Sequence, residues 1–376
     1  MRPKRLISLL VAVCMMITML PLSAVTAFAA DTSTVHEAND GDGIYKYAYT
    51  VNAENGTATI TKFLGPVDPA NNGPYDIEIP TELDHHPVTG LGEYSFSGTY
   101  SPDHQTNHNL ISFCNQIQSV TIPESVTSIG KSAFEHCSKL DSLTIKGVAT
   151  SIGAYAFASC TSLTSLSLVG SFQTIGDSAF VNCGMTSLTI DATITSIEKY
   201  AFSSRFLTSL SLTGNVQKIG DHAFDSCSSL NTVTFPKSPT SIGSYAFDSC
   251  TSLNSIEIPG TVTEIGDCAF YHCSGLTSVK IDEGVQSTGA DMFNDCGQLT
   301  TVTFPESLTT IADGSFASCS NLNHVKIPAR VTCIGDSAFS NCTSLSEITL
   351  QDGVKTIGAN AFFPAKRSPR SLCRTV

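Results

Sequence analysis

The segment IGDSAFSNC at residues 334–342 nearly repeats IGDCAFYHC at 265–273 and IGSYAFDSC at 242–250. Its phenylalanine recurs through most of the chain, at Phe96, Phe134, Phe157, Phe180, Phe202, Phe224, Phe247, Phe270, Phe293, Phe316, Phe339 and Phe362. The first step is 38 residues, and every later step is 22 or 23. A fixed period of this length predicts a stack of repeated units rather than one globular core.

One unit predicts one strand and one short helical turn. In DSAFSNC, Asp336 can cap a helical turn that places the phenylalanine and the cysteine on its inner face. In LNSIEIP at 253–259, Ile256 and Ile258 alternate with polar residues, as in a strand that Pro259 ends. Such a unit buries too few apolar side chains to fold alone, so stacked copies must share a core. The fold class is therefore an α/β solenoid of about twelve coils of 22–23 residues, with a parallel sheet on its concave face and helical turns opposite.

The repeats divide the chain into four parts. Residues 75–362 are expected to form one solenoid, with an insertion at about 97–111 that lengthens the first step. Asn55-Gly56 between alternating runs predicts a hairpin, and residues 30–74 would form an N-terminal cap around it. The basic tail at 363–376 ends the repeat, and we expect it to be disordered or the product of a truncated reading.

Residues 1–29 are typical of a secretory signal peptide, because a basic start, an apolar run and Ala27-Phe28-Ala29 follow one another. The sequence contains no second long apolar stretch, so we expect a secreted protein without a membrane span. It could still be retained at the cell surface by other means. The net charge of −13 makes nucleic acid an unfavourable partner.

Cysteine occupies one repeat position ten times, at Cys114, Cys137, Cys160, Cys183, Cys227, Cys250, Cys273, Cys296, Cys319 and Cys342. Arg205 is the one departure. Stacked coils would bring these cysteines within disulfide range, but their regular spacing favours free thiols that pack as small buried side chains. No C-x-x-C pair indicates zinc, and we expect no cofactor.

The phrase IGxxAFxxCxxLxxΦxΦP, in which Φ is apolar, resembles the BspA-like, treponemal-type leucine-rich repeats. The resemblance covers residues from about 75 to 362, and residues 45–63 are also similar to the N-terminal part of that family. It implies a leucine-rich-repeat solenoid in a secreted or cell-surface bacterial protein that takes part in adhesion or in the recognition of extracellular proteins.

Repeat proteins of this form usually bind through the concave strand face. The early coils carry serine or threonine at the outward strand positions there, which either fill an exposed strand or form a broad polar docking face. The later coils carry more charge, and they are the predicted partner-binding residues: Ser255, Glu257, Ser278, Lys280, Thr301, Thr303, His324, Lys326, Glu347 and Thr349.

An aromatic stripe is the alternative binding site. Tyrosine precedes the Ala-Phe pair or its equivalent in alternate early coils, at Tyr94, Tyr155, Tyr200 and Tyr245. The stripe either reflects duplication of a two-coil unit or provides spaced aromatic contacts for a partner.

Asp84, His85 and His86 in one turn, and Asp103, His104 and His108 in the insertion, could hold a metal only if the two loops met. A shallow sheet of hydroxyl groups offers no recessed pocket for catalysis, and we expect no enzyme activity and no metal. The leading hypothesis is thus a protein-interaction module whose partners are extracellular proteins. The alternatives are a structural spacer of a larger surface protein and, less favoured, a metal-dependent activity in the insertion. The final coil could also pair edge to edge with a second molecule.

Overall fold

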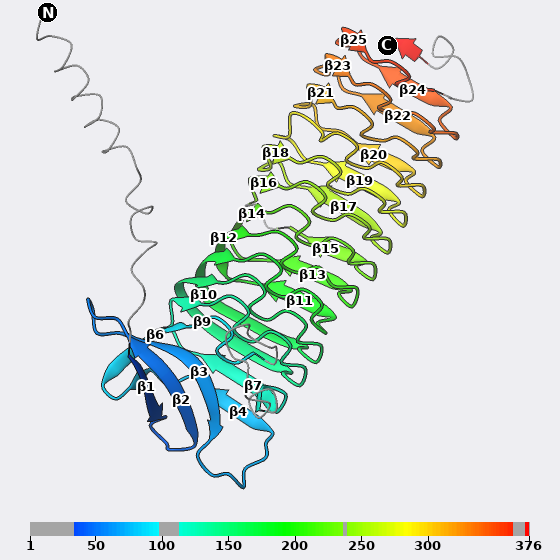
Figure 1. Ribbon diagram of the computed structural model, residues 1–376. Helices are drawn as coiled ribbons and strands as arrows, with labels where there is room; N and C mark the ends of the chain where they lie inside the picture. The colour runs from blue at the N-terminus through cyan, green and yellow to red at the C-terminus, as the bar shows by residue number, and fades with distance from the viewer. Residues whose placement is uncertain (1–33, 98–112, 236–238, 364–372, 376) are drawn as a thin grey trace, which may run out of the picture. The chain divides into compact units, whose positions relative to one another are not determined.

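The structure is a computed structural model, and it describes residues 34–97, 113–235, 239–363 and 373–375. The chain divides into two units, Met1–Thr34 and Val35–Val376, and the coils belong to the second. Two ladders of parallel strands run side by side along these coils (Figure 1). Most coils therefore contribute two short strands where the sequence predicts one.

We call the two sets of strands the leucine ladder and the isoleucine ladder. The leucine ladder follows the Leu-x-x-Φ-x-Φ segments and contains β4 (Tyr75–Glu78), β7 (Ile117–Ile122), β11 (Ser187–Ile190), β13 (Ser209–Leu212), β15 (Thr232–Thr234), β17 (Ser255–Ile258), β19 (Ser278–Ile281), β20 (Thr301–Thr303), β22 (His324–Ile327), β24 (Glu347–Leu350) and β26 (Cys373–Thr375). The isoleucine ladder contains β6 (His86–Leu91), β8 (Ser128–Ile129), β12 (Thr193–Ile197), β14 (Val216–Ile219), β16 (Ser241–Ile242), β18 (Glu264–Ile265), β21 (Thr310–Ile311), β23 (Cys333–Ile334) and β25 (Thr356–Ile357). Two longer strands, β9 (Ser142–Ile152) and β10 (Ser165–Ile175), run through both.

The first coils meet an antiparallel hairpin. Strands β2 (Tyr45–Val51) and β3 (Ala58–Pro66) flank the Asn55-Gly56 turn, and β1 (Val35–Asn39) pairs with β2. Strand β3 then pairs in parallel with β6. The two-residue strand β5 (Glu82–Leu83) pairs with β6 in antiparallel fashion. The hairpin thereby continues the isoleucine ladder.

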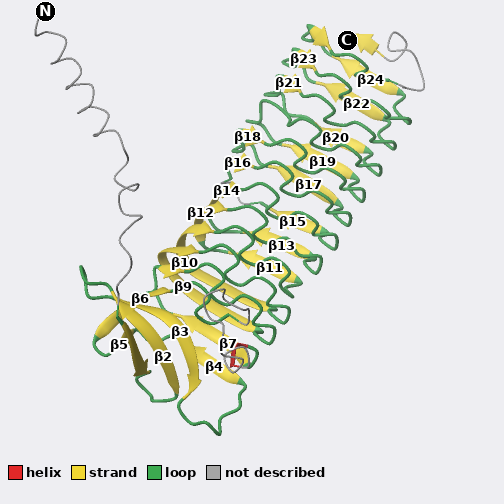
Figure 2. Ribbon diagram, viewed as in Figure 1, coloured by secondary structure: helices red, strands yellow, loops and turns green. Residues whose placement is uncertain are grey.

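The predicted helical turns are wrong. Apart from Phe113 and Cys114, which are helical, the described residues form strands, turns and irregular segments (Figure 2). The reason lies in the backbone of the Ala-Phe corner, where a left-handed residue stands before Ala-Phe and usually a second one before Cys, as at Tyr245 (φ 56°) and Ser249 (φ 56°). A left-handed residue interrupts a right-handed helix. The corner N–H groups instead bond to the next coil, as from Phe224 N to Ala246 O at 2.8 Å.

The aspartate of the repeated phrase also helps to hold successive coils together. Asp336 does not cap a helix of its own coil; its Oδ1 accepts a hydrogen bond from Ala359 N in the next one at 2.6 Å. Gly153 shows how closely coils approach, since a Cβ at this position would lie 2.7 Å from Ile129 O of the preceding coil. The repeated Ile-Gly-Asp phrase is therefore explained by contact between coils.

The core is a column of stacked phenylalanine rings. From Phe134 to Phe362 each ring lies 5.1–5.6 Å from the next, at interplanar angles up to 21°. These marks enclose about ten stacked turns, and twelve coils are not supported. Phe96, which a 38-residue step separates from the regular series, stacks on Phe134 at 4.5 Å and on Phe63 of the hairpin at 5.4 Å, and so joins the column to the hairpin.

A column of thiols runs beside the rings. The cysteines of the column are free and buried, and nearly all donate a hydrogen bond from Sγ to the carbonyl oxygen of a phenylalanine in the preceding coil, as from Cys183 to Phe157 at 3.2 Å. The residue that replaces cysteine in this column is Ser204, and the prediction that it is Arg205 is wrong. Ser204 is buried in the column, where its N–H contacts Cys227 Sγ at 3.5 Å, and Leu207 N bonds to Ser204 O as Leu230 N bonds to Cys227 O.

Candidate functional site

The predicted partner-binding residues lie in rows on the outer face of the leucine ladder. In β17, β19 and β20 the register aligns Ser255 with Ser278 and Thr301, and Glu257 with Lys280 and Thr303. In β22 and β24 it aligns His324 with Glu347 and Lys326 with Thr349. We treat the ten residues as two patches, one on β17, β19 and β20 and one on β22 and β24, because β20 and β22 are neighbours that are not paired as strands.

The first of these patches neutralises its own charges. Lys280 Nζ lies 2.5 Å from Glu257 Oε1 and 2.9 Å from Asp282 Oδ1. The hydrogen bond to Glu257 raises the pKa of Lys280. Exposed ion pairs of this kind contribute little binding energy. The patch on β22 and β24, with its histidine, lysine and glutamate, is therefore the stronger part of the predicted face.

The aromatic stripe has a ring that the tyrosine pattern omits. His222 lies between Tyr200 and Tyr245, with ring centroids 4.6 Å from the first and 4.9 Å from the second. Lys199 Nζ lies 5.2 Å from the centroid of Tyr200, on the end of this three-ring row. We call Tyr200, His222 and Tyr245 the corner row. The predicted stripe contained tyrosines alone and left out His222, whose imidazole makes the stack of rings continuous.

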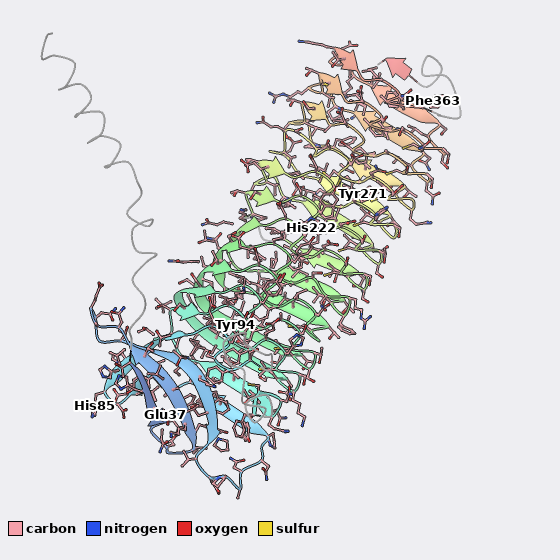
Figure 3. All side chains as sticks on the ribbon, in the orientation of Figure 1. Glu37, His85, Tyr94, His222, Tyr271 and Phe363 are labelled. Atoms are coloured by element: carbon pink, nitrogen blue, oxygen red, sulfur yellow. The ribbon has the colours of Figure 1, made fainter. Side chains whose placement is uncertain are left out.

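The other two tyrosines of the predicted stripe stand apart from the corner row. Ser178 separates Tyr155 from Tyr200, and Ser132 separates it from Tyr94. Tyr155 is 42% exposed. Tyr94, His222 and Tyr271 follow one line along the coils (Figure 3).

Every residue of the stripe has a left-handed backbone, with φ of 55° at Tyr200, 53° at His222 and 56° at Tyr245. This conformation costs a residue with a side chain about 1–2 kcal/mol. Gly314 and Asn360 occupy the same repeat position, which shows that the fold accepts residues better suited to it. Aromatic side chains are therefore not required by the backbone of the corner.

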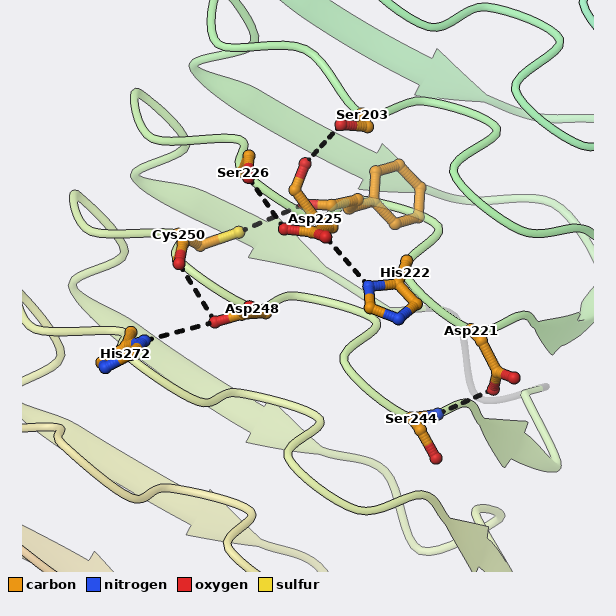
Figure 4. A network of polar contacts seen from close by, with 11 residues as sticks. Ser203, Asp221, His222, Asp225, Ser226, Ser244, Asp248, Cys250 and His272 are labelled. Carbon is orange, nitrogen blue, oxygen red and sulfur yellow. Dashed lines mark hydrogen bonds and ion pairs between the residues drawn. The ribbon is translucent and has the colours of Figure 1, made fainter.

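Carboxylates flank the corner row. His222 Nδ1 lies 2.9 Å from Asp225 Oδ2, and Ser226 Oγ donates to Asp225 Oδ1 at 2.8 Å (Figure 4). Two coils further, His272 lies between Asp248, 3.8 Å from Nδ1, and Asp295, 3.1 Å from Nε2. These contacts fix the imidazoles against the corners.

Tyr245 is tied to the following coil. Its side-chain hydrogen bond with Cys268 raises the pKa of Tyr245 to about 12. Burial raises the pKa of Cys268 as well. Both groups are therefore protonated at neutral pH, and the hydroxyl at the end of the row stays uncharged.

Only one of the two predicted histidine loops lies within the described residues. Asp103, His104 and His108 lie outside the described residues. Asp84 Oδ2 accepts a hydrogen bond from the Tyr49 hydroxyl at 2.8 Å, and His86 Nδ1 lies 2.8 Å from Gly56 O. Among residues with described positions, no group of three or more His, Cys, Asp or Glu side chains could hold a metal ion.

Stacked parallel strands around a phenylalanine core define a leucine-rich-repeat solenoid, a class that is typically a non-enzymatic protein-interaction module. The chain belongs to the BspA type leucine rich repeat family, whose model matches residues 105–206, 195–323 and 240–367 in six copies. Comparison with curated proteins finds no significant match.

Two solved structures illustrate the similarity. A leucine rich cell surface protein from Faecalibacterium prausnitzii is 26% identical, with 92% of this chain and 95% of that chain covered and a TM-score of 0.44. A leucine-rich repeat protein from Bacteroides ovatus is 25% identical, with 87% and 92% covered and a TM-score of 0.47. In the described part of this chain, no helix has the length and apolar character needed to cross a bilayer.

Proposed function

We propose that this protein is an extracellular recognition module that binds a host or neighbouring-cell protein through the corner row. The observation that carries the proposal is the presence of aromatic rings at backbone positions where glycine, asparagine or serine is easier to accommodate. Residues held in strained conformations cluster at functional sites, and tyrosine is enriched among the residues that dominate binding energy.

Membership of the BspA type leucine rich repeat family, whose homologues are cell-surface proteins, supports an extracellular setting for this function. The signal-like residues 1–29 point the same way. Adhesion would follow if the partner is itself anchored to a cell or to extracellular matrix. Repetition of weak contacts along the coils would then add to the affinity of the row.

The test is binding of the purified protein to a panel of extracellular-matrix and bacterial surface proteins. A row variant changes Tyr200, His222 and Tyr245 to Ser, the residue that Ser132, Ser178 and Ser337 already place in this left-handed conformation. We expect saturable binding that the row variant loses while its thermal unfolding stays close to that of the parent.

A strand-face variant provides the matched comparison, with Glu257, Lys280, His324, Lys326 and Glu347 changed to Ser. Loss of binding in this variant alone would transfer the function to the leucine ladder and contradict the corner row. Absence of binding to any panel protein would instead favour a structural spacer within a larger surface protein.

A further inference from the structure

Two consecutive repeats are one residue short, and both deletions fall at the same corner. The steps from Phe180 to Phe202 and from Phe202 to Phe224 are 22 residues, whereas the steps after them are 23. Leu163 is the sixth residue after Phe157, but the corresponding Met185 and Leu207 are the fifth after their own phenylalanines. The chain is therefore shortened twice between the ring column and the leucine ladder.

In the second short coil the missing residue is the left-handed one. Asn182 (φ 56°) and Ser226 (φ 58°) hold this conformation just before the thiol column in the coils on either side, whereas Ser203, which precedes the column in the coil between them, does not. Because Ser204 takes the column position, Arg205 and Phe206 occupy the two places before the leucine. The next coil has Ser228 and Ser229 there.

The shortened corners leave a notch of about 370 Å³, a volume within the range of ligand sites. The residues that line it are Thr161, Asn182, Ser203, Ser204, Arg205, Phe206 and Ser226. The Phe206 ring is 42% exposed, and the Arg205 guanidinium carbon lies 5.0 Å from its centroid. Arginine stacked on an aromatic ring is a frequent anchor of protein interfaces.

The serine hydroxyls of the notch already donate to the protein. Ser203 Oγ donates to Asp225 O at 2.6 Å, Ser226 Oγ to Asp225 Oδ1 at 2.8 Å, and Ser204 Oγ to Cys183 O at 2.8 Å. The donors that remain for a ligand include the guanidinium of Arg205 and the amide of Asn182. A carboxylate, which only accepts, satisfies such donors fully.

We propose that the notch binds an acidic side chain with an adjacent apolar residue on a protein partner. The carboxylate would pair with Arg205, and the apolar side chain would cover the exposed face of Phe206. A sugar fits less well, because a neutral molecule cannot neutralise the charge of Arg205 as a carboxylate does. The site extends the proposed function to a second surface and does not depend on the corner row.

The experiment selects a displayed library of random dodecapeptides on the purified protein and measures the recovered peptides by titration. We expect sequences with Asp or Glu beside an apolar residue. Replacement of Arg205 and Phe206 by Ser, as in the next coil, should weaken their binding tenfold or more, since charge-assisted hydrogen bonds are lost.

A second variant leaves both residues in place. Insertion of Asn between Ser203 and Ser204 restores the usual corner length, fills the notch and should also abolish binding. A variant with only Tyr200 and Tyr245 changed to Ser keeps His222 on Asp225 and should bind the peptides normally, which separates failure of this proposal from failure of the corner row. Selected peptides without acidic residues, unchanged binding to the two notch variants, or a glycan array signal lost in them would each overturn the proposal, as would a selection that enriches nothing.

Discussion

Raising the pH should unfold this solenoid through its thiol column. Burial raises the pKa of Cys183, Cys227 and Cys342 to about 12, whereas an unperturbed thiol titrates near 9. Burial also raises the pKa of Cys160 and Cys319 well above that value. A thiolate in this column would be surrounded by phenylalanine rings with no cation beside it, so the folded state keeps the thiols protonated.

The sign of the effect follows from which state releases protons. Because the folded pKa lies above the unfolded pKa, the stabilisation is complete below about pH 9 and is lost as the pH rises toward 12. Each thiol lowers the unfolding free energy by about 1.4 kcal/mol per pH unit in that window. Cys183, Cys227 and Cys342 alone should therefore make the protein about 4 kcal/mol less stable at pH 10 than at pH 7, a large part of a typical stability of 5–15 kcal/mol.

The measurement is urea unfolding followed by circular dichroism between pH 7 and pH 10, with a reductant present. The control replaces Cys183, Cys227 and Cys342 by Ser, which does not titrate and which Ser204 already shows in this column. The variant should lose about 4 kcal/mol of the pH dependence, whatever its stability at pH 7. A parent protein with constant stability over this range, or a variant with an unchanged slope, would refute the reasoning.

Three further predictions concern the core and the corners, and urea unfolding measures each. Phe247→Ala should cost about 3–5 kcal/mol because Phe247 stacks between two rings, whereas Phe362→Ala, at the end of the described column, should cost less; equal costs would contradict the column. Tyr155→Asn should stabilise by about 0.5–1 kcal/mol, since asparagine tolerates φ 57°, while Tyr245→Asn should gain less because it loses its stacking on His222. Gly314→Ala should destabilise by at least about 1–2 kcal/mol, because φ is 59° and the new Cβ would meet Asp291; an unchanged stability would show that the corner relaxes.

Much of the solenoid is predictable from the period of the sequence, because stacked coils must place like side chains on like. The stacked phenylalanines and the buried thiols follow directly from that rule. The predicted helical turn was wrong because the corner contains left-handed residues such as Ser249. Serine adopts several backbone conformations, so the residue type alone does not reveal this one. A signal for the second strand was present in the repeated Thr/Ser-Ile-Gly phrase. In most coils the column residue lies three positions before the leucine, as Cys227 lies before Leu230. The same spacing from Leu207 would have placed Ser204, and not Arg205, in the column.

The two proposed surfaces share a physical cause. In the ladders and columns each side chain must match its neighbour one coil away, so a change in one coil disturbs two interfaces. The exposed positions of the corners are less constrained, because backbone hydrogen bonds such as that from Phe224 N to Ala246 O hold successive corners together whatever the exposed side chain is. Tyr200, His222 and Tyr245 are three consecutive rings at a position that is Ser, Gly or Asn in several other coils, and Arg205 and Phe206 differ from Ser228 and Ser229 at another. Departures from the repeat at exposed corners are therefore where specificity for a partner can be added without loss of the fold.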